Sequence, residues 1–190
     1  PDRSRDRLCV VHCMSSRWTI SLLGTLAARR GDAVVRPLSA KASALLAWLA
    51  LNARTPHTRE ELATLLWPDA SPSAGRHSLR TALYDLRRLL EPPPEIPGSV
   101  LAADRDSVQL VSEAFTTDVD AFTAAASAAG AAQRADRIDA IRRAEALYGG
   151  ELLPGSFEPW VLAERRRLAE IHAGLLARLL AELSDAGDVR

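Results

Sequence analysis

Lysine is almost absent from this sequence of 190 residues: Lys41 is one of 24 basic side chains, and the others are arginines. Heavy use of Arg and Ala is typical of a GC-rich genome, so the arginines alone indicate no function. Cysteine is also scarce, because Cys9 and Cys13 are too few thiols for a zinc site. No apolar run is long enough to span a membrane, and the first segment lacks the apolar core of a secretion signal. We therefore expect a protein of the reducing cytoplasm with no membrane association.

Signals of catalysis are missing as well. The sequence contains neither the G-x-x-x-x-G-K-[ST] phosphate loop nor the G-x-S-x-G nucleophile elbow. The four histidines lack metal-ligand spacing, and we expect His57, in a loop, and His172, on a helix flank, to be ordinary surface or rim residues. Asp118 and Asp120 suit the start of a helix better than an acid/base pair. We therefore predict no enzyme, no catalytic residue, no metal site and no cofactor.

Charge divides the chain into unlike halves, although the total is zero. Residues 14–111 hold 12 basic and 9 acidic side chains, a net charge of +3, whereas residues 112–190 hold 9 and 13, a net charge of −4. We expect three segments. Residues 1–13 either precede a natural start at Met14 or were added to the protein. Residues 14–113 form one domain, and residues 114–190 form a helical domain. The small basic excess predicts modest DNA affinity with a steep dependence on salt.

The stretch from Thr58 to Leu90 is the most informative. Thr58 and Glu61 have the spacing of a capping box, and Pro68 ends the helix that they begin. Asp69–Gly75 is small and polar, which indicates a loop, and a second helix is expected over about 74–90. Its leucines 79, 83, 86 and 90 fall on one side at 100° per residue and should be buried. This pattern predicts a helix-turn-helix.

The opposite side of the second helix is polar and basic. Arg can hydrogen bond to guanine or to phosphate, and His, Thr and Tyr can contact bases or backbone oxygens. The alternative is an ordinary solvated face, and Asp85 on the outer side would repel phosphate. The candidates for groove contact are Arg76, His77, Arg80, Thr81, Tyr84 and Arg88, and those for phosphate contact are Thr58, Arg59, Arg87 and Arg105.

The remaining amino-terminal elements fit a winged helix. Alternation from Trp18 to Leu22 predicts a strand, followed by strands at 26–30 and 33–36 around a Gly31-Asp32 turn. Ser39 should cap a helix to about Asn52, with residues 45, 46, 48 and 49 in the core. After an irregular loop at 91–98, the segments 100–103 and 107–111 predict a hairpin with Arg105 at its tip. The aspartates at 104 and 106 are better explained by turn chemistry than by DNA contact.

The carboxy-terminal half is rich in Ala, Leu, Arg and Glu. We expect a helix capped by Thr117, a second over about 135–148 and a long third one from Pro159. The leucine face of the third helix is too broad for a lone surface helix, so it should pack on a neighbouring repeat or a second chain. The run from Arg165 to Arg167 is predicted to be a solvated face rather than a DNA contact.

The order of several short motifs carries a family resemblance. These are Trp18–Gly24, Leu65–Asp69, Ser78–Arg80, Leu83–Leu90, the join at Phe115, Asp118 and Phe122, Leu147–Gly155, and Trp160 to Leu168. From about Arg17 onward the sequence resembles the SARP transcriptional activators. The resemblance implies a mainly α fold with small β-sheets: an OmpR/PhoB-type winged helix-turn-helix followed by an α-helical, tetratricopeptide-like bacterial transcriptional activation domain. Such proteins typically carry further helical pairs, so we expect the second domain to be truncated.

The resemblance also implies partners. The third helix of such winged helices enters the major groove of double-stranded DNA, usually at direct repeats. The loop before it can face RNA polymerase, here through Trp67, Asp69, Ser71 and Ser73. The helical domain would pair protomers as a homodimer, sense a signal or restrain the DNA-binding half. The alternative is a signal-relay or protein-interaction module of a larger regulator that binds no DNA, which the near-neutral charge and Asp85 favour.

Overall fold

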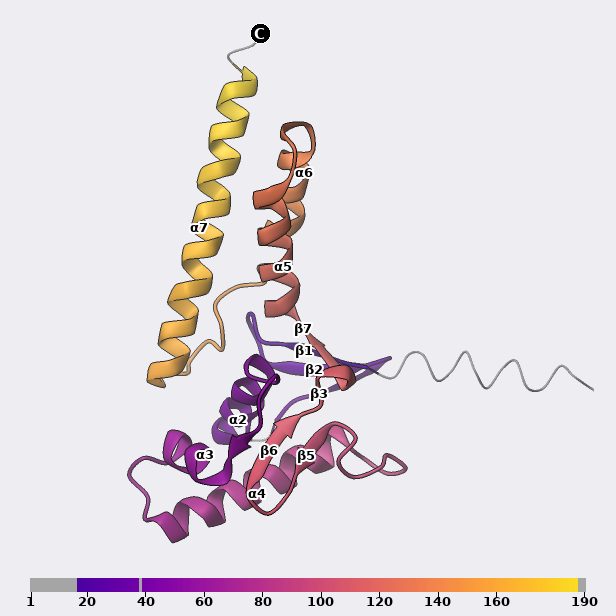
Figure 1. Cartoon of the computed structure of the whole chain (residues 1–190), viewed down its shortest axis with the longest axis vertical. Helices are drawn as coiled ribbons and strands as arrows, with labels where there is room; N and C mark the ends of the chain where they lie inside the picture. The colour runs from indigo at the N-terminus through magenta and orange to yellow at the C-terminus, as the bar shows by residue number, and fades with distance from the viewer. Residues whose placement is uncertain (1–16, 38, 188–190) are drawn as a thin grey trace, which may run out of the picture. The chain divides into compact units, whose positions relative to one another are not determined.

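The computed structural model describes residues 17–37 and 39–187, so the predictions made for the segment 1–13 and for Met14 lie outside the described residues. The chain forms two compact units. The first contains the described residues up to Ile20 together with Leu26–Thr116, and the second contains Ser21–Thr25 together with the chain from Thr117 on. Figure 1 shows the small strands near the helices of the first unit and the three long helices of the second. The predicted fold class, a winged helix followed by a helical domain, is confirmed.

The first sheet contains the predicted amino-terminal strands. β1 (Trp18–Ser21), β2 (Ala27–Arg30) and β3 (Ala33–Val35) are joined by β7 (Phe115–Thr117) in the order β3-β2-β1-β7. β2 and β3 pair antiparallel, with Arg30 opposite Ala33. The alternation predicted for β1 holds, because Trp18 and Ile20 are buried and Thr19 is exposed. β7, which follows a short 3-10 turn (Ser112–Ala114), was not predicted.

The first unit also contains three helices: α2 (Ala40–Leu51), α3 (Arg59–Leu66) and α4 (Pro72–Leu90). The hydroxyl of Ser39 accepts from the amide of Ala42, as its predicted capping role requires. The predicted start of α4 near residue 74 was wrong. Ser71 accepts from the amide of Ala74 and Pro72 occupies the first turn, so the helix begins inside the expected loop.

A second sheet holds the wing. β5 (Leu101–Ala103) and β6 (Ser107–Leu110) form the predicted hairpin, with Ala103 opposite Val108. A two-residue strand, β4 (His57–Thr58), pairs with β6 on its other side, giving the order β4-β6-β5. The prediction that His57 is an ordinary loop residue was therefore wrong. Pairing with β6 holds it in a sheet immediately before α3.

The core of the first unit lies where α2, α3 and α4 pack together and against the wing. The predicted leucine side of α4 is buried, as are the facing leucines of α2 and α3 and the inward residues of the wing. The indole Nε1 of Trp18 donates to the carbonyl oxygen of Leu90 over 3.0 Å, which fixes the end of α4 on the first strand. The largest fully buried side chains in this unit are Ile20, Leu45, Leu46, Leu49, Leu62, Leu66, Leu79, Leu86, Leu90 and Leu101.

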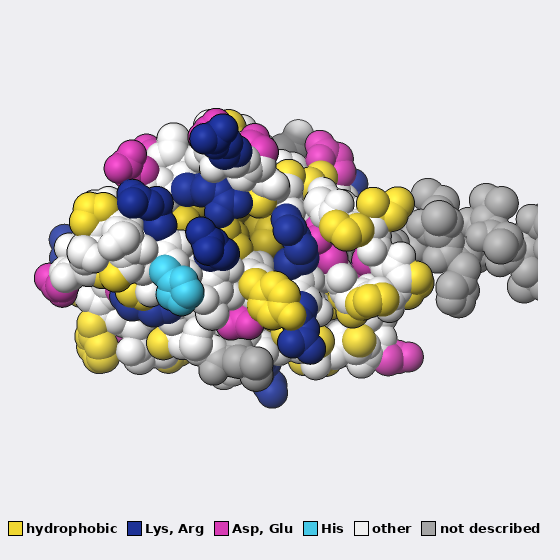
Figure 2. All heavy atoms as spheres, turned by 90° about the horizontal axis from the view of Figure 1, so that it is seen from below, with side chains coloured by type: hydrophobic (Ala, Val, Ile, Leu, Met, Phe, Trp, Pro, Cys, Tyr) yellow, Lys and Arg dark blue, Asp and Glu magenta, His cyan; other side chains and the backbone are white. Residues whose placement is uncertain are grey.

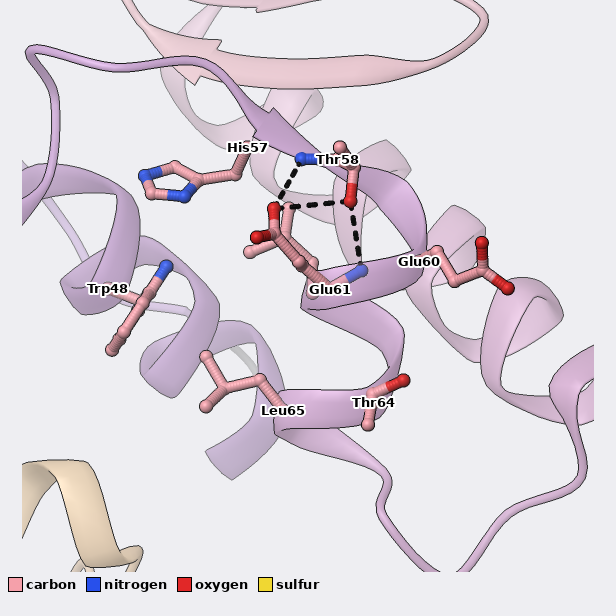
Figure 3. Close-up of a pocket in the computed structure, with 8 residues that line it drawn as sticks. Trp48, His57, Thr58, Glu60, Glu61, Thr64 and Leu65 are labelled. Atoms are coloured by element: carbon pink, nitrogen blue, oxygen red, sulfur yellow. Dashed lines mark hydrogen bonds between the residues drawn. The ribbon is translucent and has the colours of Figure 1, made fainter.

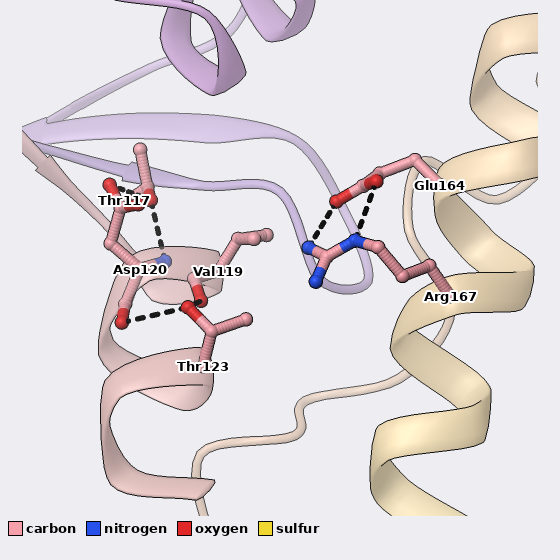
Figure 4. A network of polar contacts seen from close by, with 6 residues as sticks. All are labelled: Thr117, Val119, Asp120, Thr123, Glu164 and Arg167. Carbon is pink, nitrogen blue, oxygen red and sulfur yellow. Dashed lines mark hydrogen bonds and ion pairs between the residues drawn. The ribbon is translucent and has the colours of Figure 1, made fainter. Parts of the chain in front are cut away.

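The second unit contains the three predicted helices, α5 (Asp118–Ala131), α6 (Arg134–Glu145) and α7 (Pro159–Gly187). α6 ends earlier than predicted, and Leu147 beyond it is 39% exposed. The hydroxyl of Thr117 accepts from the amide of Asp120, as the predicted cap requires, and donates to its carboxylate (Figure 4). Phe122, Ile141 and Leu168 are fully buried, one from each helix.

The arginine run at the start of α7 was predicted to be a solvated face, but only two of its three arginines fit this prediction. Arg165 is tied to the loop before the helix, since its guanidinium donates to the carbonyl oxygens of Leu152, Leu153 and Ser156. Arg166 is exposed. Arg167 forms an ion pair with Glu164 on the same helix (Figure 4), which raises the pKa of its guanidinium. The prediction holds for the last two arginines and was wrong for Arg165.

His172 is a second correction on α7. It was expected to be an ordinary surface or rim residue, but its ring stacks on Tyr148 with the ring centres 4.1 Å apart and contacts Phe122 edge-on. The ring is half-buried, and its Nε2 is buried without a hydrogen-bond partner. His172 is therefore part of an aromatic cluster that joins α5, α7 and the segment after α6.

Asp118 links α5 to the segment Ser21–Thr25 of the second unit. Its carboxylate accepts hydrogen bonds from the amides of Leu22 and Leu23 at 2.8–3.0 Å. Removal of this carboxylate by Asp118→Ala leaves two buried N–H groups without an acceptor, so we expect the free energy of unfolding to fall by about 2–3 kcal/mol. Chemical denaturation measures this loss. The matched control is Asp136→Ala, in the exposed first turn of α6, which should change stability by less than about 0.5 kcal/mol.

Asp118→Ala should also change how the stability of the protein depends on pH. Burial raises the pKa of the Asp118 carboxyl, and the amides of Leu22 and Leu23 only partly offset this effect. The folded state therefore holds this proton more tightly than the unfolded chain does. The contribution of Asp118 to stability decreases as the pH rises from the unfolded pKa through the folded one. Asp118→Ala should remove this part of the pH dependence of the free energy of unfolding. An unchanged pH dependence in the acid range would contradict the assignment of the effect to Asp118.

Candidate nucleic-acid interface

The outer side of α4 carries all six residues predicted to contact a DNA groove. Each of these side chains is exposed, whereas Gly75, Leu79, Ala82, Leu83, Leu86 and Leu90 on the inner side are buried. Figure 2, seen from the α4 side of Figure 1, shows basic side chains gathered on this face beside a histidine, with most acidic side chains towards its margin. The sequence places the basic residues outward because the leucines fix the rotation of the helix. The exposed set is Arg76, His77, Arg80, Thr81, Tyr84 and Arg88.

Two of these residues support each other. The guanidinium carbon of Arg88 lies 5.7 Å from the ring centre of Tyr84, whose side chain is 59% exposed. Such a contact orders the arginine without removing its donors from solvent. Among the described residues, no carboxylate forms an ion pair with Arg76, Arg80 or Arg88. Their guanidinium groups remain available to an external anion.

Arg87, a predicted phosphate contact, makes two contacts within the unit. Its Nε lies 3.4 Å from the carboxylate of Glu91, and its Nη2 donates to the carbonyl oxygen of Leu101. It therefore links the end of α4 to the first strand of the wing. Asp85, which was expected to repel phosphate from the outer side, is only half-buried and remains the one acidic residue on α4.

Glu91 is a structural residue that the sequence analysis missed. Its side chain is fully buried directly after α4, where one oxygen accepts the amides of Val100 and Leu101 and the other accepts the amide of Gly98. These bonds fold the proline-rich loop back and position the wing. A second clamp on this loop is the ion pair of Arg30 with Glu95 at 2.7 Å. No local pattern marks Glu91, because its partners lie seven to ten residues away in an irregular segment.

The wing tip is ordered by Asp104, as the turn-chemistry prediction requires. Its carboxylate accepts the amides of Asp106 and Ser107 and the hydroxyl of Ser107, and these bonds hold its pKa below the usual range. Asp106 contributes its carbonyl oxygen, which accepts the amide of Arg59. Arg105 is exposed at the tip. The turn therefore uses the carboxylate of Asp104 and the backbone carbonyl of Asp106, and the side chains of Arg105 and Asp106 are both exposed.

Arg59 and Thr58 are both engaged within the unit. The Nε of Arg59 donates to the carbonyl oxygen of Asp104 over 2.9 Å, which joins the start of α3 to the wing tip. Thr58 and Glu61 form the predicted capping box, so the threonine hydroxyl is already bonded to both the amide and the carboxylate of Glu61 (Figure 3). The amide and hydroxyl of Thr58 lower the pKa of Glu61. Only the remaining donors of Arg59 are left for a phosphate.

A hollow of about 550 Å³ lies between α2, β4 and α3 and is lined by Trp48, His57 and Leu65 with the acidic start of α3 (Figure 3). Trp48 was expected in the core, but it and Leu65 are both half-buried. The Trp48 and His57 rings meet edge to face with centres 5.9 Å apart. Apolar spacing alone could not distinguish these two residues from their buried neighbours.

The segment predicted to face RNA polymerase is divided by the start of α4. Trp67 caps the end of α3 and is half-buried, whereas Asp69 is exposed in the turn. Ser71 caps α4, and Ser73 lies within its first turn, with the two hydroxyl oxygens 3.3 Å apart. The connection between the helices is therefore Trp67–Ser71, shorter than the predicted loop to Gly75.

Helices long and apolar enough to cross a membrane do not occur in the described part of the chain. Within the same residues, no three His, Cys, Asp or Glu side chains lie together in a way that could hold a metal ion.

Comparisons with known proteins agree with this geometry. The family described as "Transcriptional regulatory protein, C terminal" matches residues 32–102. The Regulatory protein AfsR of Streptomyces coelicolor is 31% identical over 187 residues, covering 98% of this chain but 19% of AfsR. Mycobacterium tuberculosis EmbR, solved in complex with a low affinity phosphopeptide, matches with a TM-score of 0.61 and 26% identity, covering 87% of this chain and 43% of EmbR. The chain therefore spans less than half of either relative, and these likenesses agree with the resemblance to the SARP regulators that its sequence motifs indicate.

Proposed function

We propose that this chain is a sequence-specific activator that inserts α4 into the major groove of its promoter. The observation that carries the proposal is the exposed outer side of α4, where three arginines with no ion-pair partner among the described residues lie over a buried leucine seam. An α-helix fits the major groove, and Arg donates in pairs to guanine. Among the exposed residues, Arg80 lies mid-helix and is the first candidate for base readout.

The wing supplies contacts outside the major groove in this proposal. Arg105 is exposed at the tip of a turn that the Asp104 carboxylate orders, so its guanidinium can reach a phosphate or the minor groove. Arg59 supports this position from α3 through its bond to Asp104. We assign phosphate contact to Arg105 first and to the remaining donors of Arg59 second, because phosphate contacts fix register without reading sequence.

The turn between α3 and α4 is the proposed contact with RNA polymerase. Pro68 and Asp69 are exposed there, and the segment is held at both ends by Trp67 and Ser71 as helix caps. A rigid turn directly beside the DNA-contacting helix can reach a protein bound to the adjacent promoter. Asp69 is the charged group through which we expect this contact.

The test is selection of DNA by the full chain from a randomised duplex pool, followed by footprinting on the selected sequence. We expect enrichment of one motif, and affinity that falls steeply between 50 and 200 mM salt, because each phosphate contact releases a counterion. Retention on heparin also tests whether the chain binds a polyanion such as DNA, and it does not require a known DNA site. A chain that enriches no motif and passes heparin at low salt would instead be the signal-relay module that its near-neutral charge allows.

A further inference from the structure

The hollow between α2, β4 and α3 has the size and lining of a small-ligand site. Its volume of about 550 Å³ lies within the range of roughly 300–1,000 Å³ that such sites occupy. Figure 3 shows the rings of Trp48 and His57 on one side of the hollow, facing Glu61 and Leu65. Leu62, which is fully buried, also lines it. The hollow therefore combines apolar walls with two titratable side chains.

Glu61 contributes a carboxylate of which one oxygen is uncommitted. Its Oε2 accepts the amide of Thr58 over 3.0 Å and the hydroxyl of Thr58 over 3.1 Å, as part of the capping box. Its Oε1 accepts no hydrogen bond from the described residues. The bonds from Thr58 hold the pKa of the carboxyl below its usual value, so the group is ionised at neutral pH. The hollow therefore contains a negative charge with an open acceptor oxygen.

His57 contributes a second acceptor. Its Nε2 lies 3.2 Å from the carbonyl oxygen of Asn52, and because a carbonyl oxygen only accepts, the proton of the neutral ring belongs on Nε2. The other ring nitrogen, Nδ1, then carries a lone pair, and none of the described residues donates to it. The two polar groups that line the hollow from β4 and α3 can therefore both accept a hydrogen bond.

The backbone at the start of α3 does not offer donors to an anion, although a helix start often does. The amides of Thr58 and Glu61 are used within the capping box. The amide of Arg59 donates to the carbonyl oxygen of Asp106. Glu60, which also lines the hollow, adds a second exposed carboxylate. This arrangement favours a positively charged donor over an anion.

We propose that this hollow binds a small organic cation, namely a protonated amine or guanidine attached to an apolar body. The charged head donates to the open oxygen of Glu61 and to Nδ1 of His57, and the apolar body lies against Leu65 and Trp48. Such a ligand satisfies both acceptors and removes apolar surface from water. Because the Glu61 side chain is exposed, we expect a modest affinity, with a dissociation constant on the order of 0.1–1 mM.

The experiment is an NMR titration of the ¹⁵N-labelled full chain with benzylguanidine, at about pH 7.5 and without DNA. We expect saturable shifts centred on the amides of residues 57–65. Benzylurea has the same shape but no charge, so it should bind about fivefold more weakly. Phenylacetate, an anion of similar size, should not bind. Because no DNA is present, failure of the proposed DNA recognition would leave these results unaffected.

Glu61→Gln tests the charge in the hollow. A glutamine at this position keeps the capping box, so α3 should stay folded while the negative charge is lost. We expect the affinity for benzylguanidine to fall about fivefold and that for benzylurea to change by less than about twofold. The matched control is Glu60→Gln, whose side chain points away from the two rings in Figure 3. It should change either affinity by less than about twofold, and circular dichroism confirms that both variants fold.

Several outcomes would overturn the proposal. They are the absence of saturable shifts, equal binding of benzylguanidine and benzylurea, and equal losses of affinity in Glu60→Gln and Glu61→Gln. An arginine side chain of a partner protein has the same charged head, and acetylarginine amide tests this source. Tighter binding of acetylarginine amide than of benzylguanidine would assign the hollow to a protein partner and overturn its assignment to a small molecule.

Discussion

Replacing Arg80 and Arg88 by alanine together should weaken binding to the selected DNA by about 100-fold while leaving the fold intact. Both side chains are exposed on the outer side of α4, and neither forms an ion pair in the described chain. A lost arginine contact to a base or phosphate costs about 1–3 kcal/mol, so two lost contacts account for this loss. Fluorescence anisotropy with the labelled duplex measures it, and thermal unfolding should shift little.

The matched control removes the same charge elsewhere. Arg142 and Arg143 are exposed on α6, and their double alanine variant lowers the net charge by the same two units. If only overall charge mattered, both double variants would lose equal affinity. Equal binding by the wild type and the Arg80/Arg88 variant would contradict the assignment of α4 as the recognition helix.

Single variants separate the two kinds of contact. A residue that reads a base should lower affinity for the selected sequence more than for random DNA, whereas a phosphate contact should weaken both equally and reduce the salt slope by about one. We expect Arg80→Ala to show the first behaviour. Arg88→Ala should show the second, because its guanidinium lies over the Tyr84 ring towards the end of the helix.

Local signals predicted most of the fold. Ser39, Thr58 and Thr117 each cap the helix that was expected to follow, since a capping hydroxyl acts within three residues of itself. The leucine seam likewise fixed the outward face of α4. The start of α4 was misplaced because Ser71-Pro72, a cap followed by a first-turn proline, was hidden in a segment rich in loop residues.

Contacts between distant residues could not be predicted from local pattern. β4 exists only because His57 and Thr58 pair with β6, about fifty residues later in the chain. Arg165 looked like part of a solvated charge run, yet three carbonyl oxygens of the preceding loop surround its guanidinium. In both cases the residue type permits several environments, and the tertiary fold selects one of them.

The second large effect is expected from Glu91→Ala, which should lower the free energy of unfolding by about 3–5 kcal/mol. The carboxylate is fully buried and accepts three backbone amides, and it faces the half-buried guanidinium of Arg87. Its removal leaves these donors without an acceptor in a site that water does not reach, and unsatisfied buried donors cost about 1–3 kcal/mol each, with some relief from relaxation.

Comparison of Glu91 with Glu95 shows why position rather than charge matters here. Both glutamates lie in the same proline-rich loop and pair with an arginine, but the Arg30–Glu95 pair is partly exposed, and the Glu95 carboxylate accepts no backbone amide of the described residues. Glu95→Ala should therefore cost at most about 1 kcal/mol in urea denaturation. Glu91→Gln should lie between the two alanine variants, because it keeps one acceptor oxygen. Equal losses for Glu91→Ala and Glu95→Ala would show that the loop, and with it the wing beside α4, is held by something other than the buried carboxylate.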